Sequence, residues 1–199
     1  AEMTRRTAGA IQARPGARRA KPAITTPSET AASAIMCGNA PRVFGSWLVP
    51  GATFHPDDAD LPELVAAAFG PQGLRVVKLH CSVGAFSPAD PRLNPLWVAA
   101  SAARVPVVVH AGQVGGGDTL DSEVRELEPV LAAHPRLRLV LAHAGHPATA
   151  AALELMARFD NAYADLTPVW MSRVAITVDD LRRFPGRFLF GSDAPNNPT

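Results

Sequence analysis

Six side chains that can bind a metal ion or move a proton recur at similar places in the sequence: Lys78, His80, His110, His143, Asp165 and Asp193. Each lies at or just after the end of a short apolar run, as in RVVKLH and RLRLVLAH. Neutral imidazole is a ligand for Zn²⁺, Mn²⁺ or Fe²⁺, and an aspartate can add an oxygen ligand while serving as a base toward water. These residue types favour metal-assisted hydrolysis, provided that the fold brings them together.

Two His-Ala-Gly triplets support the idea of a site. In both of them, which begin at His110 and His143, a small residue and a glycine follow the histidine. This lets the chain turn sharply at a strand end without shielding the ring. Any single histidine could instead be an ordinary core or loop residue, so the hypothesis depends on the whole set.

The elements that would position these residues follow a regular pattern of strands and helices. We expect strands at 42–49, 74–80, 105–110, 137–143, 162–165 and 187–192. We expect helices at 61–69, 95–103, 122–133, 149–159 and 178–184. From residue 74 onward the strands begin 25 to 32 residues apart, which is typical of βα units. The pattern predicts an α/β fold with a parallel sheet.

Parallel strands place all their carboxyl ends on one side of a sheet, so the six side chains can converge. An open sheet would gather polar residues mainly at one switch point between two strands. Because five successive strands contribute, the pattern favours a closed ring of strands.

Composition indicates one packed domain. The 199 residues are 47% hydrophobic and 19% charged, which excludes a disordered or fibrous protein. No apolar run approaches the ~18 residues that would cross a bilayer, so we expect no membrane partner. Two cysteines are too few for a disulfide framework, which favours a reducing, cytoplasmic location.

The first 34 residues are expected to form a basic, poorly ordered segment, and residues 35–199 a partial barrel that carries the metal-dependent hydrolase site. Residues 1–22 hold six Lys or Arg against one Glu. They lack both the apolar stretch of a signal peptide and a clear amphipathic period. A solvated tail is therefore favoured over a nucleic-acid-binding arm.

From Arg42 to Pro195 the sequence resembles the amidohydrolase-related branch of the metal-dependent amidohydrolase superfamily. That branch includes enzymes like aminocarboxymuconate semialdehyde decarboxylase as well as lactone and amide hydrolases. The matching pieces, in order, are VKLH at 77–80, DPRLNPL at 90–96, PVVVHAG at 106–112, LAHAG at 141–145, AYADL at 162–166 and RFLFGSDAP at 187–195. Their order and spacing carry the resemblance.

The resemblance implies a TIM-type (β/α)8 barrel with one divalent metal ion, zinc in the first place and manganese or iron as alternatives. It implies that His110 and Asp193 bind the metal, and that Asp193 and His143 are catalytic. We place four further residues in substrate-contacting or supporting roles: Lys78, His80, Asp165 and Trp170.

The sequence departs from the family pattern at its amino-terminal side. The His-x-His pair of the family's first strand occurs nowhere in the 199 residues. We therefore expect an incomplete barrel of about six βα units, without the first two units and the last helix. A fragment, a truncated gene product, or a barrel completed by a partner chain would each account for this.

These observations predict a metal-dependent hydrolase that acts on a C–N or C–O bond of a small-molecule amide or lactone. Two alternatives stay open: a decarboxylase on the same scaffold, and a truncated product without catalysis. The expected partner is a small-molecule substrate, and assembly into a homo-oligomer is left open.

Overall fold

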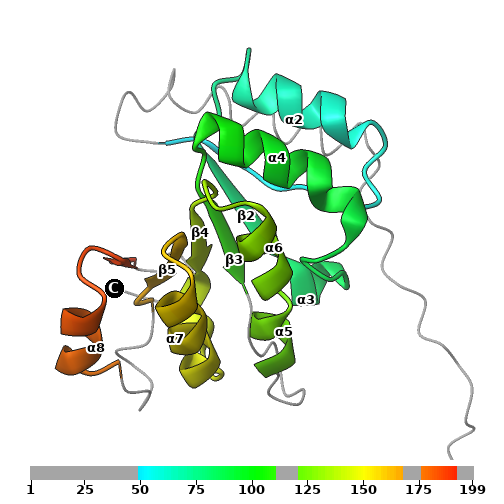
Figure 1. Cartoon of the computed structure of the whole chain (residues 1–199). Coiled ribbons are helices and arrows are strands. Elements are labelled where there is room, and N and C mark those ends of the chain that lie inside the picture. The colour runs from blue at the N-terminus through cyan, green and yellow to red at the C-terminus, as the bar shows by residue number, and fades with distance from the viewer. Residues whose placement is uncertain (1–48, 111–120, 168–175, 192–199) are drawn as a thin grey trace, which may run out of the picture.

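The computed structural model describes residues 49–110, 121–167 and 176–191, and in them six parallel strands form one sheet (Figure 1). The strands are β1 (Gly51–Ala52), β2 (Val76–His80), β3 (Val107–His110), β4 (Leu139–Leu141), β5 (Ala162–Asp165) and β6 (Phe188–Leu189). Each strand pairs with the next one along the chain. This order, with all strands parallel, is that of the wall of a (β/α)8 barrel.

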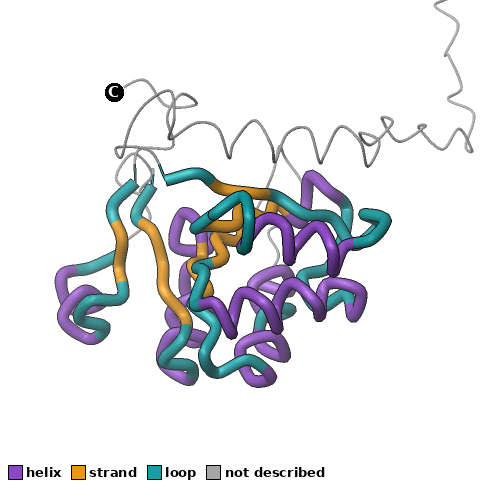
Figure 2. Tube along the Cα trace, turned by 90° about the horizontal axis from the view of Figure 1, so that it is seen from above, coloured by secondary structure: helices purple, strands orange, loops and turns teal. Residues whose placement is uncertain are grey.

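Helices connect the strands and cover one face of the sheet (Figure 2). The longer ones are α2 (Leu61–Phe69), α4 (Asn94–Ala103), α6 (Glu128–Ala133), α7 (Thr149–Arg158) and α8 (Val178–Arg183). Shorter turns are α3 (Cys81–Gly84), α5 (Asp121–Arg125), η2 (Pro91–Leu93) and η3 (Ala142–Gly145). No helix in the described ranges has the length and hydropathy needed to cross a lipid bilayer.

Alternate strand residues divide between the core and the opposite face. In β2, Val77 and Leu79 are fully buried, as are Val107 and Val109 in β3, and they pack into one core with residues of the helices. Lys78 is exposed, and His80 and His110 are half-buried. Because side chains alternate along a strand, the candidate residues share the face opposite the core.

Several expected elements differ in the structure, among them the first strand and the third helix. Of the strand expected at 42–49, only Val49 lies within the described residues, and it is exposed and outside any strand, whereas β1 begins at Gly51. The helix expected at 122–133 is divided into α5 and α6. The physical reason is Pro129, which lies in the first turn of α6 and has no N–H to donate to the preceding turn.

Candidate functional site

Three imidazole rings meet at the carboxyl ends of β2, β3 and β4. The rings of His80 and His110 are stacked, with centroids 4.0 Å apart and an interplanar angle of 17°. The ring of His143 lies edge-on to His110, with centroids 4.9 Å apart and an angle of 70°. We call these three side chains the imidazole row. Residues up to 63 positions apart in the sequence thus contact one another in series.

Strand register explains the stacked pair. His80 and His110 are direct partners in the parallel pairing of β2 with β3, so their side chains leave the sheet side by side on the same face. Val77, Lys78 and Leu79 pair with the residues of β3 that precede His110 in the same register. The pairing of the two apolar strands therefore fixes the ring contact.

His143 is not positioned by a strand. A strand was expected at 137–143, but β4 ends at Leu141, before His143. The chain enters the η3 turn, where His143 and Ala144 have φ values of 56° and 49° and Gly145 has 67°. Left-handed backbone is costly for residues other than glycine, so the surrounding structure must hold it.

Asp165, at the end of β5, holds this turn. Its Oδ1 accepts hydrogen bonds from the backbone N–H of His143 at 2.9 Å and from that of Thr167 at 3.0 Å. His143 also donates a hydrogen bond from its ring Nδ1 to the backbone carbonyl of Thr167. A carbonyl can only accept, so Nδ1 carries the proton and Nε2 is the ring atom left to bind a ligand or exchange a proton.

The surroundings of His80 disfavour its charged form. The pKa of His80 lies below its ordinary value, chiefly because burial disfavours the charged ring, and further because of the charges of Lys78 and His143. Lys78 precedes His80 by two residues and so lies on the same face of β2. The Ser82 hydroxyl lies 3.4 Å from Nδ1 of His80.

The described residues do not by themselves form a complete metal site. Among them, no group of three or more His, Cys, Asp or Glu side chains is arranged to hold a metal ion. Asp193 and Trp170 lie outside the described ranges. Of the residues selected from the sequence, the structure places the other five at one end of the sheet: Lys78, His80, His110, His143 and Asp165.

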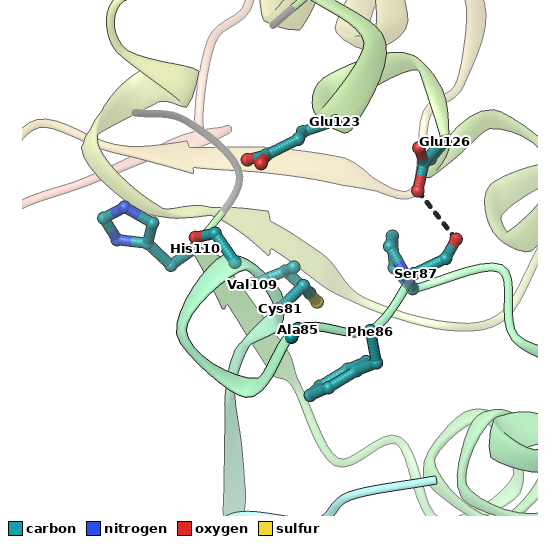
Figure 3. Close-up of a pocket in the computed structure, with 10 residues that line it drawn as sticks. Cys81, Ala85, Phe86, Ser87, Val109, His110, Glu123 and Glu126 are labelled. Carbon is teal, nitrogen blue, oxygen red and sulfur yellow. Dashed lines mark hydrogen bonds between the residues drawn. The ribbon is translucent and has the colours of Figure 1, made fainter. Parts of the chain in front are cut away.

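A cavity of about 370 Å³ lies beside the row, between the α3 turn and α5 (Figure 3). Its lining includes Cys81, Phe86 and two carboxylates that the sequence analysis did not select, Glu123 and Glu126. His110 is itself a lining residue of the cavity, and in Figure 3 its ring points away from Phe86. Glu123 lies in the short helix α5 and Glu126 directly follows it, and so short a segment gives no spacing pattern that would have identified the two carboxylates.

Cys81 is not a nucleophile in this cavity. Burial, followed by the charges of Glu123 and Glu126, raises the pKa of its thiol to about 12. The thiolate is the reactive form of cysteine. Cys81 therefore acts as a small buried apolar side chain, as is common for free cysteines.

Comparison with protein families gives a match over residues 47–199 to the family described as amidohydrolase. A search among curated proteins gave no match.

Solved structures with the same fold include an uncharacterized TIM-barrel protein from Bordetella bronchiseptica (TM-score 0.64, 20% identity, 87% of this chain and 61% of that one). Another is 5-carboxyvanillate decarboxylase from Sphingomonas paucimobilis (TM-score 0.65, 15% identity, 88% of this chain and 66% of that one). A third is a probable 2-pyrone-4,6-dicarboxylic acid hydrolase from Acinetobacter baumannii (TM-score 0.58, 17% identity, 80% of this chain and 62% of that one). The chain spans less than two thirds of each. The similarity confirms that the parallel sheet has the TIM-type barrel fold.

The electrostatic environment of His80 leads to a first prediction. In metal-free protein, Lys78→Met should raise the pKa of His80 toward its ordinary value, because one positive charge that disfavours the imidazolium is removed. NMR titration of the ring protons measures this pKa. His134 is the matched control, because burial alone lowers its pKa. An unchanged His80 pKa, or an equal change at His134, would contradict this description of the site.

The two hydrogen bonds of Asp165 lead to a second prediction. Asp165→Ala removes the acceptor of two part-buried N–H groups and should lower the free energy of unfolding by about 1–3 kcal/mol. Asp165→Asn retains Oδ1 and should lose less than half as much. Urea unfolding of both variants measures the difference. Equal losses would show that the carboxylate charge, rather than the acceptor atom, holds the turn.

Proposed function

Because the chain belongs to the amidohydrolase family, we propose that it acts as a metal-dependent hydrolase on a C–N or C–O bond of a small-molecule amide or lactone. The observation that carries this proposal is the imidazole row at the carboxyl ends of three adjacent strands. In barrels of this type, that end of the sheet is where catalytic groups lie.

One divalent metal ion fits the donor chemistry of the row. His110 and Asp193 would hold it, and zinc is the first candidate, with manganese or iron as alternatives. The described residues include no complete three-ligand group, so His110 requires additional ligands from elsewhere in the chain. Asp193 follows β6 in the sequence and is our candidate for one of them. When bound, such an ion supplies a Lewis acid that polarises a carbonyl oxygen and lowers the pKa of water.

His143 and Asp193 would manage the protons. Because Nδ1 of His143 donates to the Thr167 carbonyl, Nε2 would be the nitrogen that exchanges a proton with the substrate. In its neutral form Nε2 can accept a proton, and in its protonated form it can donate a hydrogen bond to the oxyanion that develops as the carbonyl is attacked. Asp193 is the proposed general base that removes a proton from the attacking water.

The remaining residues would position the substrate and the catalytic groups. The Lys78 ammonium, on the face that carries the row, offers a contact for an anionic substrate group, and His80 packs against His110. Asp165 is a positioning residue that acts through the backbone of His143. Trp170 is proposed to line the substrate pocket.

A decarboxylase is the second candidate, and a specific similarity favours it. One of the solved structures is a decarboxylase of an aromatic carboxylic acid, and it has a TM-score as high as that of the other two. A barrel with the same groups at its strand ends could release carbon dioxide from such an acid, with His143 as the proton donor to the ring carbon.

Metal content tests the proposed ligand set. The full chain, purified with excess Zn²⁺ and then desalted, should retain about one equivalent by elemental analysis. His110→Ala should reduce that amount by at least about tenfold, because it removes a direct ligand. His134→Ala, outside the row, is the matched control and should retain the metal. Little metal in the unaltered chain would favour the truncated, non-catalytic alternative.

Product analysis distinguishes the two reactions. With a panel of lactones, amides and aromatic carboxylic acids, a hydrolase consumes water and releases no carbon dioxide, and we expect this result. Asp193→Ala should lower kcat by about 10²–10⁴-fold, as expected for loss of a general base. Carbon dioxide release without consumption of water identifies a decarboxylase. Full activity and metal content in Asp193→Ala would refute the role of this residue.

A further inference from the structure

Most arginines of the described ranges fall into two groups. Four on helices or helical turns form ion pairs with neighbouring carboxylates: Arg92 with Asp57 and Asp90, Arg125 with Glu154, Arg158 with Glu128, and Arg182 with Asp179. A second group lies just before strands: Arg75 before β2, Arg104 before β3, Arg136 and Arg138 before β4, and Arg187 before β6. Of these, Arg187 lies 4.0 Å from the Asp160 carboxylate, and the other four form no ion pair within the described residues.

Three arginines of the second group surround one hollow. Arg104, Arg136 and Arg138, which we call the basic rim, line a hollow of about 290 Å³ together with Asn161 and Tyr163. It lies at the amino ends of β3, β4 and β5, opposite the end that carries the imidazole row. The hollow is therefore separate from the proposed catalytic site.

Hydrogen bonds hold the backbone of this rim. Arg104 ends α4 in a left-handed conformation, and its N–H donates to the carbonyl of Ala100. The Asn161 amide donates to the carbonyls of His134 at 3.0 Å and Leu131 at 3.3 Å, which ties the segment before β5 to the one before β4. A rim whose backbone is already ordered loses less entropy when a ligand binds.

The charge of the hollow selects an anion. Asp160 is the only acidic residue of its lining, and that carboxylate lies 4.0 Å from the guanidinium of Arg187. The ends of α4 and α6 lie nearby, and arginines there also compensate the partial negative charge of helix carboxyl ends. That role accounts for an arginine near each helix end, but it does not require three of them to face one hollow.

We propose that the basic rim is a second binding site, for a small molecule that carries a phosphate or diphosphate group. Guanidinium groups form paired hydrogen bonds with phosphate oxygens, and two or three of them can share one dianion. A hollow of about 290 Å³ is at the lower end of the size of small-molecule pockets. Tyr163 adds a hydroxyl that can donate to a further oxygen.

Calorimetric titration of the full chain with inorganic pyrophosphate, at physiological ionic strength, tests this site. Arg136→Gln and Arg138→Gln should each weaken pyrophosphate binding by about tenfold or more, because each removes a charge-assisted contact. Arg182→Gln is the matched control: it removes the same charge from an exposed arginine on α8 and should change the affinity less than about twofold.

Four results would overturn the proposal. They are the absence of pyrophosphate binding, unchanged affinity in both rim variants, an equal loss in Arg182→Gln, and tighter binding of citrate than of pyrophosphate. A lower Tm in the rim variants with unchanged affinity would show that the arginines only compensate the helix ends. None of these results depends on the metal content or the hydrolytic activity.

Discussion

Parallel pairing of consecutive strands is the constraint on which the other features of this protein depend. It places His80 directly opposite His110, and it turns every strand so that its carboxyl end lies at the same edge of the sheet. The two rings then stack with their centroids 4.0 Å apart. A shift of one residue in the pairing of β2 would move His80 to the face that packs on the helices and bury Lys78 in the core.

The third imidazole depends on strand pairing less directly. β4 ends before His143, so its ring is placed by the left-handed η3 turn, and that turn is held by a carboxylate from the neighbouring strand. The β4–β5 pairing brings Asp165 to the turn, because Leu141 pairs with Ala164, one residue before it. A backbone conformation that costs energy locally is thus maintained by a hydrogen bond from the His143 N–H to a carboxylate that the sheet supplies.

The sequence predicted the features that follow from hydrophobic period and missed those that follow from local geometry. Helices such as α2 and strands such as β5 lie at the expected residues, because period and flanking Pro or Gly determine them. The break between α5 and α6 depends on the single residue Pro129. Glu123 and Glu126 could not be selected, because their approach to Cys81 depends on the tertiary structure that brings α5 and the α3 turn to one cavity.

The partial prediction of the site has the same physical origin. The convergence of His110 and His143 could be inferred because both follow apolar strands. The stacking of His80 on His110 could not, since a strand residue can face either side until the pairing register is known. Likewise, the sequence suggested a supporting role for Asp165, but the tertiary structure alone shows that it binds the backbone of His143 rather than the ring.

The chemistry of the imidazole row follows from which protonation state the surroundings favour. Burial, and after it the charge of Lys78, lower the pKa of His80 and so favour its neutral ring. For His143 the Thr167 carbonyl accepts from Nδ1, which carries a proton in the neutral and the charged ring alike, so the contact persists while Nε2 gains or loses its proton. The row therefore combines a ring whose surroundings disfavour charge with a ring whose Nε2 is left to exchange a proton, which suits the proposed proton transfer.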